Sequence, residues 1–573
     1  MQLTQTKWLW TLLFAFWSYQ LQATIIYVDY QATGSNNGTS WTNAYTDFTT
    51  ALLSATFGDE IRVAEGNYLA PSGGFILKDG VRINGGYPSA TRYPIWLVES
   101  LRSYTTYPTY LEAINSGSQT TLRQTTNLSS QTRLDGLHVK GNEALRIENN
   151  QSGTVVNTQI VVTNVIFEDG DRILVTPENL ILKPTFQNCE FKNFNLFVSG
   201  TLNPQDDWAP KFNNCQFTDF DQWPTYSMFR IVVEGGRFSP EISNCEFNNN
   251  DRIFGVDVSN FLGNGGGTVE IEVVNSLFVN NVTVLWIELS HLPASFDNNF
   301  TNCTFYGNGK IDESLHSLVV EDISFSAAAS WPLQNQPTDT NPLTVMSFEN
   351  CVSWNNLNKI GKLIWLDSGL HVNVQNSLLE ASSFNSSGTS SDPVFSIPNP
   401  HPTINRVRDL GGNILNQNPQ FVNPTAATPN LRLQASSPAR NTGNNSLVPA
   451  GVTTDISVNN RILESTVEMG AYEFCTSGDG SCNTTGVPVG PMSELQLTES
   501  EMIVYPNPVK EVIHLQTDKE VKVYSTTLTS LQGEVLKTWQ TATHLEVAAL
   551  EKGLYILKLE TNKGVETIRI IKE

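Results

Sequence analysis

A six-residue phrase recurs through the middle of the chain and constrains its fold more than any other feature. It reads apolar, any residue, Asn, small, any residue, apolar. Its copies occupy residues 162–167, 186–191, 212–217, 242–247, 273–278, 300–305, 348–353 and 374–379. Successive copies follow at variable spacing, and variable insertions between short repeats predict a solenoid whose extra residues fall in loops.

The residue types of the phrase favour strands over leucine-rich repeats. β-formers alternate with period two and are bounded by Asn and Gly. We therefore predict an all-β chain whose main body is a right-handed parallel β-helix. Coils about 4.8 Å apart would stack equivalent residues in columns: an inward aromatic column, an Asn column at a turn, and an inward column of small side chains. The last is expected to contain Cys189, Cys215, Cys245, Cys303 and Cys351.

Three further expectations concern the ends and the spacing of the solenoid. Residues 47–55 predict a short amphipathic helix that caps the first coil, because an open end would expose core and strand edges. The longest step, from Asn302 to Asn350, is interpreted as two coils, with residues 320–325 as an intervening copy that has Asp322 in the Asn position. Upstream, residues 133–138 are expected to begin the series, with Asp135 in that position.

Charge and hydropathy limit the compartment and the partners. With 34 Lys and Arg against 56 Asp and Glu, the net charge is −22, which argues against nucleic acid and anionic membranes as partners. Residues 1–23 predict a cleaved signal peptide: Lys7 precedes the apolar run 8–19, which is too short to span a bilayer. No other window is apolar and long enough to span, so we expect an exported protein without a transmembrane segment, and a monomer.

Three stretches resemble known families. Residues 27–29, 37–41, 44–47, 58–61 and 63–68 resemble the opening of bacterial β-helix surface proteins of the pectate-lyase-like superfamily. Residues 418–474 resemble the choice-of-anchor Q region in Asn-Pro-Gln-Phe at 418–421, Leu-Arg-Leu at 431–433, Ser-Pro-Ala at 437–439, Gly443, Arg461 and Gly-Ala-Tyr-Glu-Phe at 470–474. That resemblance implies a segment that closes the solenoid covering residues 24–474.

Residues 501–573 resemble the type A C-terminal sorting domain of the type IX secretion system. The match lies in Val-Tyr-Pro-Asn-Pro-Val at 504–509, Leu-Gln-Gly-Glu-Val at 531–535, Gly-Leu-Tyr-Ile-Leu-Lys-Leu at 553–559 and a basic-apolar end. The resemblance implies contact with the secretion machinery, passage through the periplasm and across an outer membrane, and release or attachment at the cell surface. Alternating strands with Gly-bearing turns independently predict a small Ig-like β-sandwich here, joined through a linker at residues 475–500.

Candidate site residues are few, since no phosphate loop, zinc spacing or nucleophile elbow occurs. Fixed offsets from the repeat Asn would stack Asp219, Asp221 and Asp251, a possible calcium site that competes with ordinary turn chemistry. A second set is Trp208, Trp223 and Trp331, which lie in polar, Pro-containing loops and could stack on sugar rings, unless they pack internally. Cys475 and Cys482 predict a local disulfide, with a loop metal site as the alternative.

Two functions remain open at this point. We predict a secreted or cell-surface protein that binds an extended glycan or matrix ligand along one face of the solenoid, in the manner of an adhesin and without catalysis. The alternative is a polysaccharide lyase or glycoside hydrolase that uses a calcium or carboxylate site. The net charge of −22 weighs against acidic polysaccharides unless cations bridge them. A passive surface or stalk protein is a third interpretation.

Overall fold

The computed structural model divides the chain into two compact units, Met1–Met492 and Ser493–Glu573. It describes residues 23–113, 120–148, 154–176, 179–220, 227–258, 267–289, 295–309, 320–324, 343–356, 361–362, 370–384, 395–396, 407–475, 502–505, 509–517, 522–530, 535–540, 544–562 and 564–572. The predicted signal peptide (but for Ala23) and the predicted linker (but for Cys475) therefore lie outside the described residues.

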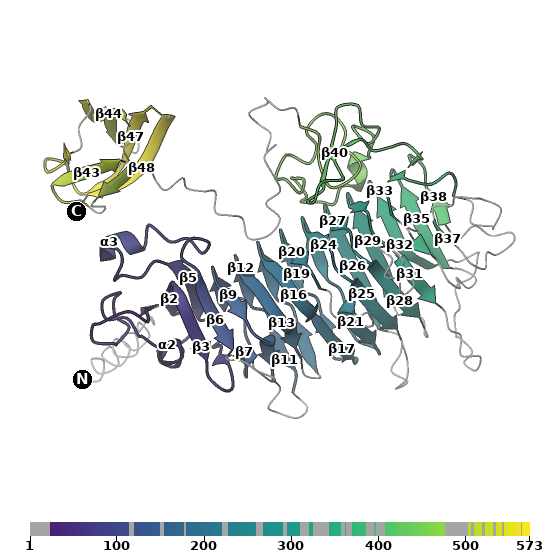
Figure 1. Ribbon diagram of the computed structural model, residues 1–573, viewed down its shortest axis with the longest axis horizontal. Coiled ribbons are helices and arrows are strands. Elements are labelled where there is room, and N and C mark those ends of the chain that lie inside the picture. The colour runs from purple at the N-terminus through teal and green to yellow at the C-terminus, as the bar shows by residue number, and fades with distance from the viewer. Residues whose placement is uncertain are drawn as a thin grey trace, which may run out of the picture. The chain divides into compact units, whose positions relative to one another are not determined.

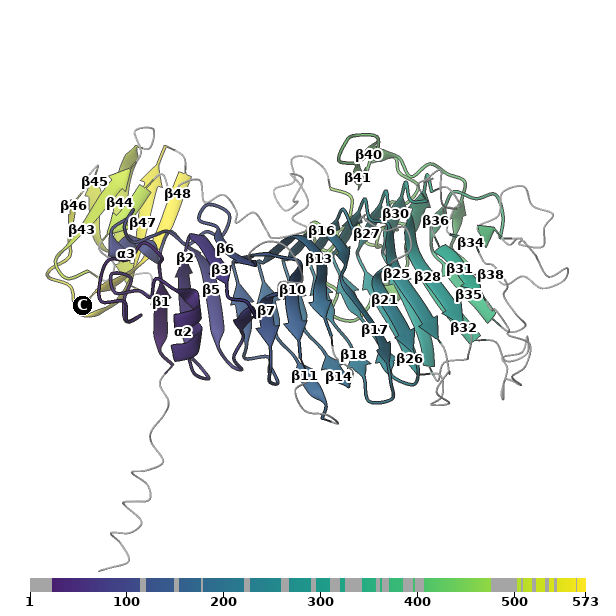
Figure 2. The same ribbon diagram turned by 60° about the horizontal axis from the view of Figure 1, so that its bottom comes forward.

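The first unit is a parallel β-helix, in which each successive coil adds one or two parallel strands to sheets that run along the solenoid (Figures 1 and 2). The first sheet contains β1 (Ile25–Val28), β2 (Glu60–Ala64), β5 (Arg82–Tyr87), β8 (Arg133–Asp135), β11 (Val156–Thr158), β12 (Val161–Thr163), β14 (Leu180–Leu182), β15 (Thr185–Gln187), β18 (Asp207–Trp208), β19 (Lys211–Asn213), β22 (Arg237–Phe238), β23 (Glu241–Ser243), β26 (Thr268–Val274), β29 (Ser295–Thr301), β32 (Leu343–Glu349), β35 (Leu370–Gln375) and β38 (Val407–Asp409).

The second sheet carries the candidate site on its outer face. Its strands are β3 (Gly66–Ala70), β4 (Phe75–Ile76), β6 (Thr109–Ala113), β7 (Thr120–Gln124), β9 (His138–Lys140), β10 (Glu143–Ile147), β13 (Ile166–Val175), β16 (Glu190–Leu196), β20 (Gln216–Thr218), β24 (Glu246–Asn248), β27 (Leu277–Val279), β30 (Thr304–Tyr306), β33 (Val352–Trp354), β36 (Leu378–Leu379) and β39 (Ile414–Leu415). A shorter third sheet contains β17 (Val198–Leu202), β21 (Ser227–Val233), β25 (Arg252–Val258), β28 (Thr283–Leu289) and β31 (Val320–Ser324), and β34 (Gly361–Lys362) pairs with β37 (Phe395–Ser396).

The predicted inward columns are present. In the second sheet the phenylalanine rings of neighbouring coils stack with centroids 4.6–5.1 Å apart and interplanar angles of 1–11°. The rings belong to Phe167, Phe191, Phe217, Phe247, Phe278 and Phe305. The five solenoid cysteines are buried free thiols, and Val165, Ser276 and Ser377 occupy the same buried position in other coils. These columns fill the interior, so the cysteine column is packing.

Asparagine side chains bridge neighbouring coils at two turns. In the predicted column, Asn188 Nδ2 donates to Asn164 Oδ1 at 3.2 Å and Asn214 Nδ2 donates to Asn188 Oδ1 at 2.8 Å. All three adopt φ of 53–55°, the left-handed region that Asn tolerates. A second, buried ladder of Asn250, Asn281, Asn308 and Asn356 lies six residues after the phrase Asn of four later coils. Within it, Asn281 Nδ2 donates to Asn308 Oδ1 at 2.9 Å and to the carbonyl of Phe247 at 2.9 Å.

The expectation for the longest step is wrong, and the upstream coil is present with a different register. Strand β29 pairs directly with β32, Phe300 opposite Phe348, so the longest step is one coil with a long insertion. Residues 320–324 form β31 of the third sheet within that coil. The upstream coil exists, but Leu134 pairs with Val162 and Asp135 with Thr163. The register is therefore shifted by one residue, and Gly136, with φ +67°, takes the turn position of the Asn.

A short helix lies against the first coil of the solenoid. Helix α2 (Phe48–Ser54) begins after Asp47, whose carboxylate accepts a hydrogen bond from the Thr50 amide at 2.8 Å and so caps the helix. Phe48, Ala51 and Leu52 face the first coil and are buried in the main core. Helix α3 (Ile95–Val98) is a single turn in the loop between β5 and β6.

Residues 418–474, here called the docked segment, pack against the side of the solenoid. The segment includes β40 (Phe421–Asn423), β41 (Asn430–Leu433) and the 3₁₀ turn η1 (Asn445–Leu447), and β40 lies beside β27 and β33 in Figure 1. A core separate from that of the bore joins outward residues of the second sheet to the segment: Leu277, Val279, Tyr306, Val352 and Leu378 with Phe421, Leu431, Leu433, Ala439, Ile456, Met469, Ala471 and Tyr472. The segment thus covers a flank, where the resemblance implied closure of the solenoid.

The second unit consists of two antiparallel sheets around a small core of its own. One contains β42 (Met502–Tyr505), β43 (Val512–Thr517) and β46 (His544–Glu546). The other contains β44 (Val523–Ser530), β45 (Val535–Gln540), β47 (Gly553–Thr561) and β48 (Gly564–Lys572).

Candidate functional site

The second sheet presents one outward side chain per coil in a single column, here called the outer stripe. Strand pairing aligns its members in the order Glu112, Lys140, Glu168, Lys192, Thr218, Asn248, Val279, Tyr306 and Trp354. Each follows the inward residue of its strand, because side chains alternate across a strand. The stripe is charged over the early coils, polar in the middle and aromatic over the late coils.

At the charged end of the stripe, acidic and basic side chains form ion pairs with one another. Glu168 lies 2.9 Å from the ammonium of Lys140 and 3.2 Å from that of Lys192, and its other neighbour is His138, 3.6 Å away. The interaction with His138 contributes most, and the two lysines contribute further, to lowering the pKa of Glu168 to about 2. At neutral pH the carboxylate is therefore ionised and paired, which makes this part of the stripe a structural ion-pair cluster.

The aromatic end of the stripe borders a hollow of about 510 Å³, here called the aromatic–amide pocket. Its aromatic side chains are Tyr306 and Trp354 from the sheet and Phe421 from the docked segment. Its other lining residues are Asn355, Asn418, Gln420, Pro424 and Gln434. Tyr306 and Phe421 meet edge to face with centroids 5.8 Å apart, while Trp354 is half-buried. Among the described lining residues none carries a carboxylate or an ammonium group.

One side of the pocket, here called the amide wall, is formed by Asn418, Gln420 and Gln434 of the docked segment. Hydrogen bonds within the segment hold this wall in place. Gln434 donates from its backbone amide to the carbonyl of Gln420 at 3.0 Å and from Nε2 to the carbonyl of Phe421 at 2.9 Å. The amide of Gln420 donates to Asn418 Oδ1 at 2.7 Å. The wall is thus fixed before any ligand arrives, which lowers the entropic cost of binding.

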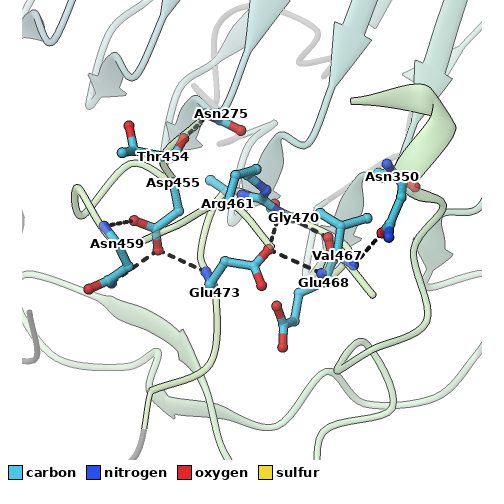
Figure 3. A network of polar contacts seen from close by, with 12 residues as sticks. Asn275, Asn350, Thr454, Asp455, Asn459, Arg461, Val467, Glu468, Gly470 and Glu473 are labelled. Carbon is cyan, nitrogen blue, oxygen red and sulfur yellow. Dashed lines mark hydrogen bonds and ion pairs between the residues drawn. The ribbon is translucent and has the colours of Figure 1, made fainter. Parts of the chain in front are cut away.

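A buried polar network holds the docked segment together (Figure 3). The guanidinium of Arg461 lies 3.0 Å from the carboxylate of Glu473, and both side chains are at most 1% exposed. Arg461 Nη2 also donates to the carbonyls of Glu468 and Gly470, each at 2.9 Å. Asp455 accepts from the Glu473 amide at 2.8 Å. These contacts fix the stretch that faces the solenoid.

Backbone and amide contacts then join that stretch to the coils. Asn275 Nδ2 donates to the carbonyl of Thr454 at 2.7 Å, and the Gly470 amide donates to the carbonyl of Asn350 at 2.7 Å. The Ala471 amide donates to Thr304 Oγ1 at 3.0 Å. Gly470 has φ +97°, and a Cβ there would lie 2.7 Å from Thr304 Oγ1, so only glycine permits this approach.

Burial shifts the pKa values of the ionisable groups in this network. It raises the pKa of Glu473 to about 8, although Arg461 acts in the opposite sense, and it also raises the pKa of Asp455. Burial likewise lowers the pKa of Arg461. Nearby on β24, burial raises the pKa of Glu246 to about 7. The docked segment therefore covers acids that resist ionisation.

The predicted tryptophan site is corrected at Trp208. This residue is 2% exposed and belongs to the main core, between Leu182 and Phe238 of the adjoining coils. The absence of a side chain at Gly200 makes room for its ring, since a Cβ there would lie 2.5 Å from the indole. The ring is therefore closed to a glycan. Trp223 and Trp331 lie outside the described residues.

The predicted acidic cluster is only partly described, because Asp221 lies outside the described residues. Asp219 has φ 57° and accepts a hydrogen bond from Asn249 Nδ2 at 2.6 Å, in a ladder between turns. Asp251 donates its amide to the carbonyl of Phe220. In the part of the chain that the structure describes, no three His, Cys, Asp or Glu side chains are placed to hold a metal ion. A calcium site here stays a prediction.

Cys475 is disulfide-bonded, and the five solenoid cysteines are free. Its predicted partner Cys482, the one remaining cysteine of the seven, lies outside the described residues. In the described part of the chain, no helix has both the length and the hydropathy needed to cross a bilayer.

Comparisons with known proteins identify the C-terminal part. Residues 503–573 match the family described as the secretion system C-terminal sorting domain. The chain thus carries a sorting domain, which directs type IX secretion to the cell surface or the exterior. No curated protein matches the chain. Among solved structures, the crystal structure of pectate lyase Pel9A aligns over 79% of this chain and 97% of its own, with 12% identity and a TM-score of 0.40. These comparisons do not test the resemblance of residues 418–474 to the choice-of-anchor Q region.

The sequence-based choice of site residues left out the two aromatic residues of the sheet that border the pocket. Tyr306 and Trp354 stand four residues after Asn302 and Asn350, directly after the inward position of the phrase. Alternation alone could have placed both on the outer face. The amide wall had no comparable signal, since it depends on how residues 418–434 pack onto the flank.

Proposed function

We propose that this secreted protein binds an uncharged stretch of polysaccharide in the aromatic–amide pocket and holds it without cleavage, as an adhesin-like surface or matrix component. The observation that carries the proposal is the pocket's lining. Aromatic rings stack on the apolar C–H face of a sugar, and side-chain amides pair with its hydroxyl groups as donors and acceptors.

The position of the pocket supports an extended ligand. It lies at the end of the outer stripe, beside coils spaced by about 4.8 Å, so a polymer can run along the flank. The charge of the lining supports binding over cleavage: general acid–base catalysis of glycosidic bonds needs paired carboxylates, and lyases need a base with charge neutralisation. The described lining residues offer neither.

A polysaccharide panel tests this function. Affinity electrophoresis of the full chain through neutral β-glucan, xylan and mannan is compared with polygalacturonate and alginate, each with calcium and with a chelator. Product analysis of the same mixtures reports cleavage. We expect retardation by a neutral polymer, unchanged by the chelator, with no new reducing or unsaturated ends. Calcium-dependent cleavage of any polymer would replace the proposal with the lyase or hydrolase alternative and would direct attention to Asp219, Asp221 and Asp251.

A further inference from the structure

A second hollow lies within the sorting domain. It measures about 720 Å³ and is lined by Lys510, Glu511, Ala548, Lys552 and Lys572. These residues come from three separate stretches: the turn before β43, the loop between β46 and β47, and the end of β48.

Backbone contacts tie the three stretches together. Val509 forms a β-bridge with Lys572, and Lys572 pairs with Gly553 across β47 and β48. The Val547 amide donates to the carbonyl of Glu511 at 2.7 Å. The lysines are therefore presented by a fixed frame, although they are far apart in the sequence.

The hollow is a local concentration of positive charge in an acidic chain. Three lysines and one glutamate are among its five lining residues, whereas the whole chain carries a net charge of −22. Lys510 and Lys552 are exposed, and neither forms an ion pair with any residue that the structure describes. Their charges are thus available to an external anion, and lysine binds phosphate as a point charge.

Three lining lysines stand next to or within sequence stretches already named. Lys510 directly follows the stretch 504–509, Lys552 directly precedes the stretch 553–559, and Lys572 lies in the basic end. Lysines that flank two motifs of the domain, and one at its basic end, therefore line the same hollow.

We propose that this hollow is a binding site for a phosphate group, one that the sorting domain engages during export. The exposed Lys510 and Lys552 exceed what the single carboxylate of Glu511 needs, and a phosphate accepts several such contacts at once. The carboxylate of Glu511 repels a bound anion and so lowers its affinity. A moderate affinity allows the contact to be released later.

Protection from acylation tests the site at single residues in the full chain. The rates of acetylation of Lys510 and Lys552 are measured by mass spectrometry with and without inorganic phosphate, at a constant ionic strength of about 0.15 M, where the Debye length is about 8 Å. The control is Lys558, which is exposed on β47 and does not line the hollow. We expect phosphate to slow Lys510 and Lys552 by about threefold or more and to leave Lys558 unchanged, because direct charge contacts act over short distances in water.

A charge variant and a lipid arm complete the test. Glu511→Gln should lower the phosphate concentration needed for protection by about threefold, since it removes the opposing charge. Protection by vesicles containing phosphatidic acid, but not by inorganic phosphate, would assign the phosphate to a lipid headgroup. Protection by neither, or equal protection of Lys558, would overturn the proposal.

Discussion

Removal of Arg461 should release the docked segment from the solenoid while the coils stay folded. Arg461→Ala deprives the buried carbonyls of Glu468 and Gly470 of their donor and leaves the carboxyl of Glu473 without its neighbouring guanidinium. Each buried carbonyl left unpaired costs about 1–3 kcal/mol. For the two carbonyls together we expect about 3–5 kcal/mol for opening of the segment.

Hydrogen exchange at the docking contacts measures that loss. The amides of Gly470 and Ala471 donate to solenoid atoms, so they exchange only when the segment opens. A loss of 3–5 kcal/mol should speed their exchange by about a hundred- to several-thousand-fold. The control is Lys211→Ala, which breaks a 2.6 Å pair with Glu241 whose side chains are more than half exposed; such pairs contribute about 0–1 kcal/mol. Equal exchange in the two variants would refute the role assigned to Arg461.

Two other predictions concern the bore and the pH response. Phe247→Ala should cost about 3–5 kcal/mol, measured by denaturant unfolding, because its ring is fully buried between Phe217 and Phe278; a cost below 1 kcal/mol would contradict the stacked column. The pKa of Glu473 rises from 4.5 unfolded to about 8 folded, so the unfolded state loses its proton first. Docking should therefore weaken as the pH rises from about 4.5 to about 8. Glu473→Gln should flatten that slope in amide exchange corrected for intrinsic rates, and an unchanged slope would argue against this assignment.

Structural features that recur from coil to coil could be predicted from the sequence. Each phrase states which residue faces inward, so the stack through Phe217 and Phe247 and the turn column through Asn188 followed from alternation and spacing alone. The same logic failed for the predicted copy at residues 320–325, because its described part, residues 320–324, belongs to a different sheet. Six residues cannot distinguish one sheet of a coil from another, because both demand the same alternation.

The candidate site depended on contacts that no local pattern encodes. Asn275 meets Thr454 across 179 residues of sequence, and that contact helps place the docked segment on the flank. Trp208 shows the same dependence on distant contacts. Its polar, Pro-containing surroundings suggested exposure, but its strand joins the first sheet and its ring points inward. Loop composition alone does not reveal which loop residues a neighbouring coil covers.

Comparison of two aromatic variants tests where the polysaccharide binds. Trp354→Ala removes a ring from the pocket, and Tyr30→Ala removes a ring that is 46% exposed near the first strand and does not line the pocket. Affinity for the best-binding neutral polymer should fall about tenfold in the first variant, the order expected for one lost aromatic contact of about 1.4 kcal/mol. It should be unchanged in the second. Equal affinity in both variants and the parent protein would contradict a glycan site at the aromatic–amide pocket.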